Sequence, residues 1–148
     1  MREYVYDYFI AHAGTDTVEA GRLFDQLSGK AKVFLDSRCL IPGDDWPTVV
    51  EKAQRNSSAT LVLISERTDQ AFYQGEEIAA AIALSREKDG PHRVIPLYLP
   101  GGSPKDDVPF GLRRKHALKI DENTSMEQVA TQLLDLRRAL AREWHREL

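Results

Sequence analysis

The segment Ala59–Ser65 (ATLVLIS) limits the possible folds most, because it shows no alternation of apolar and polar side chains. Such a run is typical of a strand that is covered on both faces, as in a parallel sheet between two layers of helices. Four more segments are rich in the apolar or aromatic residues that strands favour: Val5–Ala11, Lys32–Leu35, Arg93–Leu99 and Ala117–Ile120. The sequence therefore predicts a five-stranded α/β sheet.

Helical segments separate these strands. Apolar residues at helical spacing, a proline suited to a first turn and an alanine-rich stretch predict four helices: Thr17–Leu27, Trp46 to about Arg55, Phe72 to about Arg86, and Ser125 to about Arg142. A side-chain oxygen of Thr15 or Asp16 is expected to cap the first helix. Polar loops are expected before Trp46 and over 102–114. The alternation predicts a flavodoxin-like, doubly wound parallel sheet with the strand order 2-1-3-4-5.

Composition narrows the class of protein. The 148 residues suffice for one domain with a sizeable core, and the formal net charge of −3 does not favour nucleic acid. No apolar run is long enough to span a bilayer, and the N-terminus, which begins Met1–Tyr4, shows no apolar region of the signal-peptide kind. Cys39 is the single cysteine, and no Cys/His cluster has zinc spacing. We expect a cytoplasmic domain over residues 1–148 with no metal, nucleic acid or membrane, compatible with excision from a longer multidomain protein.

Chemically useful side chains follow three of the predicted strands. His12 follows the first strand, Asp36 ends the second, and Glu77 lies early in the helix after the third. Loops that leave the carboxyl ends of parallel strands converge on one edge of the sheet, where ligands bind. We therefore expect these three side chains to share a cleft.

Glu77 is favoured over its neighbour Glu76 by helix geometry. Tyr73 and Glu77 are four residues apart and so share a helix face, whereas Glu76 points about 100° away. The alternative is that Glu77 only complements the helix dipole.

Three segments resemble the Toll/interleukin receptor (TIR) domain family, in particular its bacterial branch. They are DYFIAHAGTD at Asp7–Asp16, FLDSRCLIPGDDW at Phe34–Trp46, and Ser65–Glu77. The second includes the mobile loop of the family, around Pro42 and Gly43. Two positions depart from the family pattern, since Ala11 replaces a serine and Tyr73 replaces a tryptophan.

The resemblance implies that Glu77 is the glutamate of the NAD-cleaving members. Cleavage of the nicotinamide–ribose bond passes through an oxocarbenium-like transition state, which a nearby carboxylate stabilises. The leaving nicotinamide is neutral and needs no proton, so no second acid is required. NAD is then a substrate, and no cofactor is expected.

The resemblance also assigns substrate contacts, and each residue has an ordinary structural alternative. Tyr73 would stack on nicotinamide, Trp46 would wall the cleft, and either could instead anchor a helix start. Asp36 would bind a ribose hydroxyl or cap the turn that begins at Ser37. His12 and Ala11 would meet the ligand at the first strand end, although a lone histidine is more often a hydrogen-bonded scaffold residue.

The implied function is an NAD nucleosidase or cyclase that leaves ADP-ribose or a cyclic isomer, serves antiphage defence and depends on assembly. Partner TIR domains, in a homo-oligomer or filament, would contact the loop at Pro42 and Gly43, where glycine is expected to take a positive φ. The alternative is a non-catalytic TIR–TIR interaction module.

Two other functions of similar folds are excluded by missing motifs. A phosphoacceptor receiver needs an acidic pair after the first strand and an aspartate after the third, but the chain has Ala11–Ala13 and Ser65–Arg67 there. A dinucleotide-binding Rossmann domain needs G-x-G-x-x-G after the first strand, which is absent.

Overall fold

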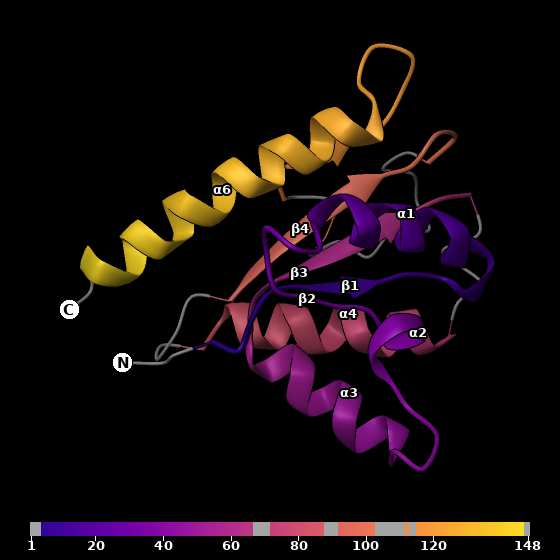
Figure 1. Cartoon of the computed structure of the whole chain (residues 1–148), viewed down its shortest axis with the longest axis vertical. Helices are drawn as coiled ribbons and strands as arrows, with labels where there is room; N and C mark the ends of the chain where they lie inside the picture. The colour runs from indigo at the N-terminus through magenta and orange to yellow at the C-terminus, as the bar shows by residue number, and fades with distance from the viewer. Residues whose placement is uncertain (1–3, 67–71, 88–91, 103–111, 113–114, 147–148) are drawn as a thin grey trace.

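The computed structural model describes residues 4–66, 72–87, 92–102, 112 and 115–146 (Figure 1). Five strands form one parallel sheet in the order β2-β1-β3-β4-β5, which confirms the predicted fold. Their bounds are β1 Tyr6–Ala11, β2 Val33–Phe34, β3 Ser57–Ile64, β4 Arg93–Tyr98 and β5 Leu118–Lys119.

The central strand β3 is buried at all eight positions, as its lack of alternation predicts. In the middle of the sheet Leu61 pairs with Ile10 of β1 on one side and with Ile95 of β4 on the other. Successive residues of β3 point to opposite faces. Leu61 and Leu63 therefore join one apolar cluster, while Val62 and Ile64 join another.

Helices cover both faces of the sheet (Figure 1). The helices α1 and α6 pack on the face that Leu61 and Leu63 occupy, and α3 and α4 pack on the opposite face. The helical elements are the 3₁₀ turn η1 Gly14–Asp16, α1 Thr17–Leu27, α2 Asp36–Cys39, α3 Trp46–Arg55, α4 Phe72–Ser85 and α6 Met126–Arg146. Every predicted helix is present.

Three local expectations need correction. The polar loop expected after the second strand begins as the short helix α2, and the last helix runs to Arg146 instead of about Arg142. The predicted cap by Thr15 or Asp16 is wrong, since α1 has no side-chain cap hydrogen bond. Asp16 is instead 3% exposed and accepts a hydrogen bond of 2.6 Å from the Ser65 hydroxyl, so its carboxylate serves a tertiary contact. The loop expected over 102–114 lies largely outside the described residues.

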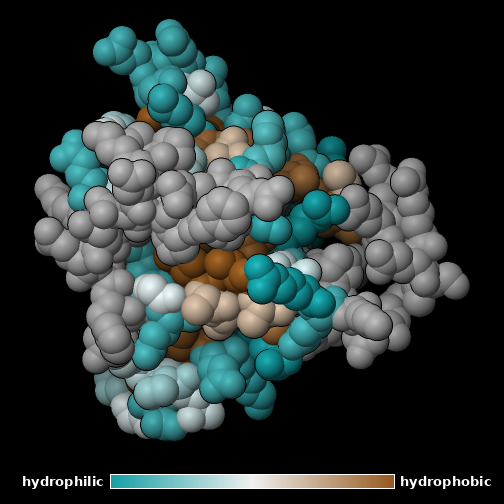
Figure 2. All heavy atoms as spheres, turned by 180° about the vertical axis from the view of Figure 1, so that it is seen from behind, coloured by the Kyte–Doolittle hydropathy of each residue, from teal (hydrophilic) through white to brown (hydrophobic). Residues whose placement is uncertain are grey.

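One face of the molecule is partly apolar. Figure 2 shows apolar residues in the middle of the face turned away from the viewer of Figure 1, with hydrophilic side chains to their right and below them. On α4 the exposed positions include Ala79, Ala80 and Ala83. None of the helices in the described residues combines the length and the apolar character needed to cross a membrane.

Truncation of the central strand is expected to destabilise the fold strongly. Leu61→Ala should lower the free energy of unfolding by about 3 kcal/mol, because the removed methyl groups leave a cavity that the close-packed sheet cannot fill. Val18→Ala, at a position 65% exposed, should change it by less than about 0.5 kcal/mol. Urea denaturation measures both, and equal effects would contradict the assigned core.

Candidate active site at the carboxyl edge of the sheet

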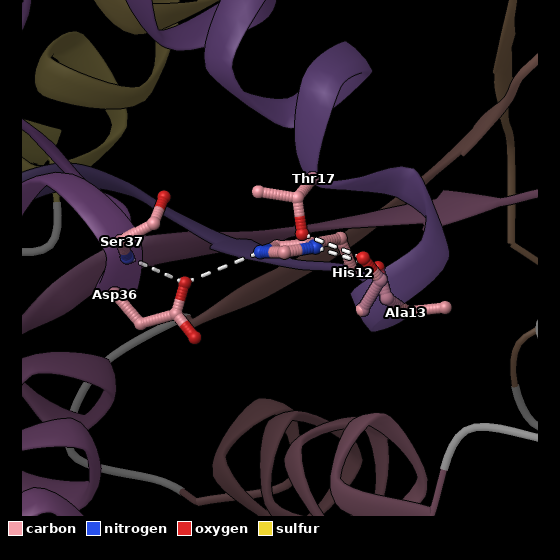
Figure 3. A network of polar contacts seen from close by, with 6 residues as sticks. His12, Ala13, Thr17, Asp36 and Ser37 are labelled. Carbon is pink, nitrogen blue, oxygen red and sulfur yellow. Dashed lines mark hydrogen bonds and ion pairs between the residues drawn. The ribbon is translucent and has the colours of Figure 1, made fainter.

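His12 lies directly after β1, and its ring spans two oxygen acceptors (Figure 3). Nδ1 is 2.8 Å from the Ala13 carbonyl oxygen, and Nε2 is 3.2 Å from Oδ1 of Asp36. Burial by itself lowers the pKa of His12, but these two hydrogen bonds and the negative charges of Asp36 and Glu77 outweigh it and raise the pKa. The geometry therefore suits an imidazolium that donates from both nitrogens.

Asp36 is the first residue of α2 and accepts two hydrogen bonds on one carboxylate oxygen. Besides His12, the Ser37 main-chain N–H donates to Oδ1 at 2.7 Å (Figure 3). The hydrogen bond from His12 is the largest cause that lowers the pKa of Asp36, against the opposing effect of burial. Asp36 thus forms the predicted turn at Ser37 and is also paired with His12.

Arg38 holds α2 in place against α1. Its guanidinium donates to both carboxylate oxygens of Asp25, at 2.8 and 3.2 Å, and lies 5.5 Å from the centre of the Phe24 ring. A four-residue helix has few hydrogen bonds of its own. These contacts therefore help to determine where Asp36 lies.

Glu77 is half-buried on α4 within the electrostatic reach of the His12–Asp36 pair. The pKa of Glu77 is raised to about 8, mainly by burial and also by the negative charges of Asp36 and Glu76, while His12 opposes them. Glu76 is exposed, so the side chain that turns inward is the one that helix spacing favoured. A carboxyl that titrates near neutral pH beside a charged pair is common at functional sites.

A pocket of about 280 Å³ lies between α3 and α4 beside Glu77. Trp46, which is 38% exposed, lines it together with Glu77, as do Pro47, Val50, Glu51, Gln54, Glu76 and Ala80. A larger cavity of about 780 Å³ opens between α1 and α6, and none of the predicted site residues lines it. Volume favours the larger cavity, but the perturbed Glu77 carboxyl lines the smaller one and lies within the electrostatic reach of the His12–Asp36 pair, so we place the candidate site there.

The remaining predicted residues, Ala11, Pro42, Gly43 and Tyr73, are not among those that line this pocket in the described part of the chain. Ala11 is fully buried in a cluster with Phe9, Phe34 and Ala53, so only its main chain is available to a ligand. Pro42 and Gly43 are exposed in the loop before α3, and Gly43 has the expected positive φ of 97°. Tyr73 belongs to α4, but its side chain is outside the described residues.

Sequence reasoning missed Gln54, which is 3% exposed and lines the pocket. Its amide nitrogen donates to the main-chain oxygen of Glu77 at 2.8 Å. A single glutamine among apolar residues of a predicted helix carries no motif, and no signal in the sequence could have singled it out. Within the described residues, no group of three or more His, Cys, Asp or Glu side chains is arranged to hold a metal ion.

Solved structures share the fold. The metazoan TIR-STING receptor from C. gigas, in complex with 2',3'-cGAMP, is 22% identical with a TM-score of 0.71, over 88% of this chain and 40% of that one. The TIR domain of the Toll-related receptor TRR-2 from Hydra magnipapillata is 20% identical with a TM-score of 0.61, over 97% and 98%. The TIR domains of the activated Roq1 resistosome, which directly recognises the pathogen effector XopQ, are 25% identical with a TM-score of 0.57, over 64% and 57%.

Two further comparisons concern sequence. The chain spans less than half of the TIR-STING receptor, and no curated protein matches it in sequence. The family model for the TIR domain, however, matches residues 9–134, which run from within β1 into the first half of α6. The match includes most of the first segment that resembles the family and all of the other two. This match, with which the sheet order agrees, shows that the chain belongs to the TIR domain family.

Proposed function

We propose that this TIR domain cleaves the bond between nicotinamide and ribose in NAD, and that Glu77 is the catalytic residue. The observation that carries the proposal is the half-buried Glu77 carboxyl, which lines a pocket within the electrostatic reach of the His12–Asp36 pair. The sequence resemblance pairs this residue with the glutamate of NAD-cleaving members. Nicotinamide would be released, leaving ADP-ribose or a cyclic isomer. NAD is consumed as a substrate, without a further cofactor or metal.

The reaction needs little from the protein beyond a negative charge in the right place. As the glycosidic bond breaks, its electron pair neutralises the nicotinamide ring, and positive charge develops on the ribose. The ionised Glu77 stabilises that charge, and a water or an internal nucleophile then attacks the ribose carbon and loses a proton. A preorganised carboxylate in a half-buried site acts more strongly than one in water.

The neighbouring residues have supporting roles in the proposal. Asp36, kept ionised by His12, binds a ribose hydroxyl. Trp46 forms a wall of the pocket, Tyr73 stacks on nicotinamide, and the main chain at Ala11 and the ring of His12 bound the substrate at the end of β1. Two observations support these roles: Asp36 and His12 act electrostatically on Glu77, and Trp46 lines the same pocket as Glu77.

Assembly is the second part of the proposal. Ile41 is 67% exposed, and Pro42 and Gly43 follow it in an exposed turn. We propose that this loop contacts another copy of the domain in a cytoplasmic homo-oligomer or filament, and that the assembly serves antiphage defence. Nucleic acid and membranes are not partners in this scheme. The same exposed loop favours the second candidate function, a non-catalytic TIR–TIR interaction module.

Removal of the Glu77 charge is expected to abolish most activity. Glu77→Gln keeps the size of the side chain but removes the charge that opposes the oxocarbenium ion, so nicotinamide release should fall about 100-fold or more. The exposed neighbour provides the matched control, and Glu76→Gln should retain parental activity. Chromatography of the nucleotide products measures the rates, and circular dichroism checks folding. If parent and both variants are equally inert when assembled, the interaction module replaces the enzyme.

The rate is expected to follow the ionisation of Glu77. Its pKa is raised to about 8, so in the free protein the active carboxylate is lost as pH falls below that value. We expect kcat/KM for NAD to rise with pH from 6 and to level off above about 8, because kcat/KM reports ionisations of the free enzyme. A profile that is flat from pH 6 to 9 would show either that Glu77 does not titrate in this range or that its ionised form is not needed for activity.

The turn at Gly43 is expected to matter for assembly more than for folding. Its φ of 97° is disfavoured for any residue with a Cβ, especially a β-branched one, although no heavy atom lies within 4 Å of a Cβ built there. Gly43→Val should therefore change the exposed loop, leave the core intact and weaken self-association. Light scattering and the dependence of specific activity on protein concentration test this, and unchanged association would remove the loop from the contact.

A further inference from the structure

A buried polar chain connects the sheet to the main chain of Glu77. It runs from β3 and the residue before β4, through α3, to α4, and all its side chains are nearly inaccessible: Gln54 is 3% exposed, Thr60 0% and His92 3%. Gln54 donates to the Glu77 main-chain oxygen at 2.8 Å and to the Thr60 hydroxyl at 3.2 Å. The Thr60 hydroxyl lies 2.7 Å from Nε2 of His92, and Nδ1 of His92 lies 2.8 Å from the Ser57 carbonyl oxygen.

The direction of each hydrogen bond in this buried network follows from its end at the Ser57 carbonyl oxygen. A carbonyl oxygen only accepts, so Nδ1 of His92 carries a proton toward Ser57. In the neutral ring Nε2 then accepts, and the Thr60 hydroxyl donates to it. The Thr60 oxygen remains free to accept from the Gln54 amide, whose second N–H goes to Glu77. The arrangement therefore fixes the orientation of the Gln54 amide.

We propose that Gln54 is a positioning residue for Glu77, which holds the backbone of α4 at that carbonyl so that the carboxyl lies beside Asp36 and His12. The inference deepens the proposed function and rests on it for its kinetic consequences. Gln54 does not touch the reacting atoms. It acts through the main chain of the residue that does, and Thr60 and His92 anchor it to the sheet.

The Glu77 carbonyl would have a partner without Gln54, because in an α-helix it accepts from the N–H four residues later. Helix α4 is also held one turn earlier, where the buried Gln74 amide donates to the Leu63 carbonyl at 2.7 Å. Docking of α4 on the sheet thus does not depend on Gln54 alone. What Gln54 adds is a fixed point at the one helix position that carries the inward carboxyl.

This reasoning leads to a variant that keeps the fold. Gln54→Met preserves the length and approximate volume of the side chain and removes both N–H donors. Thr60 still donates to His92, and the Glu77 carbonyl keeps its helical partner, so no buried polar group is left unpaired. Only the tie between sheet, α3 and Glu77 is lost.

Two measurements on the full chain separate positioning from general loss of stability. With NAD as substrate, Gln54→Met should lower kcat about ten-fold, with KM within about two-fold of the parent, because small misplacements of a catalytic group have large effects on rate. Independently of NAD, the carbon-13 titration of the Glu77 carboxyl, assigned with Glu77→Gln, should have its midpoint lowered by at least about one pH unit as water reaches the group. The charged groups that act on that carboxyl are Asp36, His12 and Glu76, and Glu51 of α3 lines the same pocket.

The matched control is Val129→Ala, a fully buried position of α6 on the other face of the sheet. It should lower the melting temperature without changing the Glu77 midpoint. Thr60→Ser keeps the hydroxyl and should resemble the parent in both measurements. If Gln54→Met does not fold, Thr60→Val, which removes the anchor of Gln54, replaces it in the same two measurements.

The outcomes are distinguishable. Parental kcat and a parental Glu77 midpoint in the Gln54 variant would overturn the inference. So would losses that merely follow the folded fraction, as in Val129→Ala. If the parent does not cleave NAD but the midpoint shifts as expected, the positioning of Glu77 stands and the proposed function fails.

Discussion

The burial of β3 on both faces is the constraint on which the rest of the structure depends. A strand with no polar face must lie at the centre of a sheet between two helical layers, and parallel pairing on both sides then places all strand ends of one kind at one edge. The site follows from this arrangement, because His12 and Asp36 follow β1 and β2 at that edge and α4 brings Glu77 to it from the next connection. Residues far apart in sequence meet there without any local motif that joins them.

The three titratable side chains at this edge, His12, Asp36 and Glu77, have different environments. The charge of each affects the pKa of at least one of the others. Asp36 accepts from both His12 and a main-chain N–H, which stabilises its ionised form. Glu77 is half-buried and has the negative Asp36 as a neighbour, so its ionised form is disfavoured. Environments that separate two carboxyl groups in this way give them different tasks, one a standing charge and the other a charge that appears with pH or with a cationic ligand.

Much of the fold and part of the site could be predicted from the sequence, for physical reasons that differ between residues. The strand order follows from the alternation of apolar runs and helical periods, and the choice of Glu77 over Glu76 follows from the period of the helix. Helix α2 has only four residues, too few to show a period. Asp16 stands just before a helix, where an aspartate is typical of a cap. Its hydrogen-bond partner Ser65 is 49 residues away, so no local pattern indicates their contact. Gln54 acquires its meaning from Glu77 and Thr60, contacts that only the packed structure provides.

The clamp between Arg38 and Asp25 has a consequence for how the site responds to its solvent. Both side chains are largely open to water, with 43% and 58% exposure, so their attraction is weakened by dissolved salt. The sheet and α4, which carry His12 and Glu77, are held by apolar packing that salt affects little. Among the elements that build the site, ionic strength therefore acts mainly on α2: as salt rises, the attraction that holds α2 to α1 weakens, while the apolar packing of the sheet and α4 is little affected.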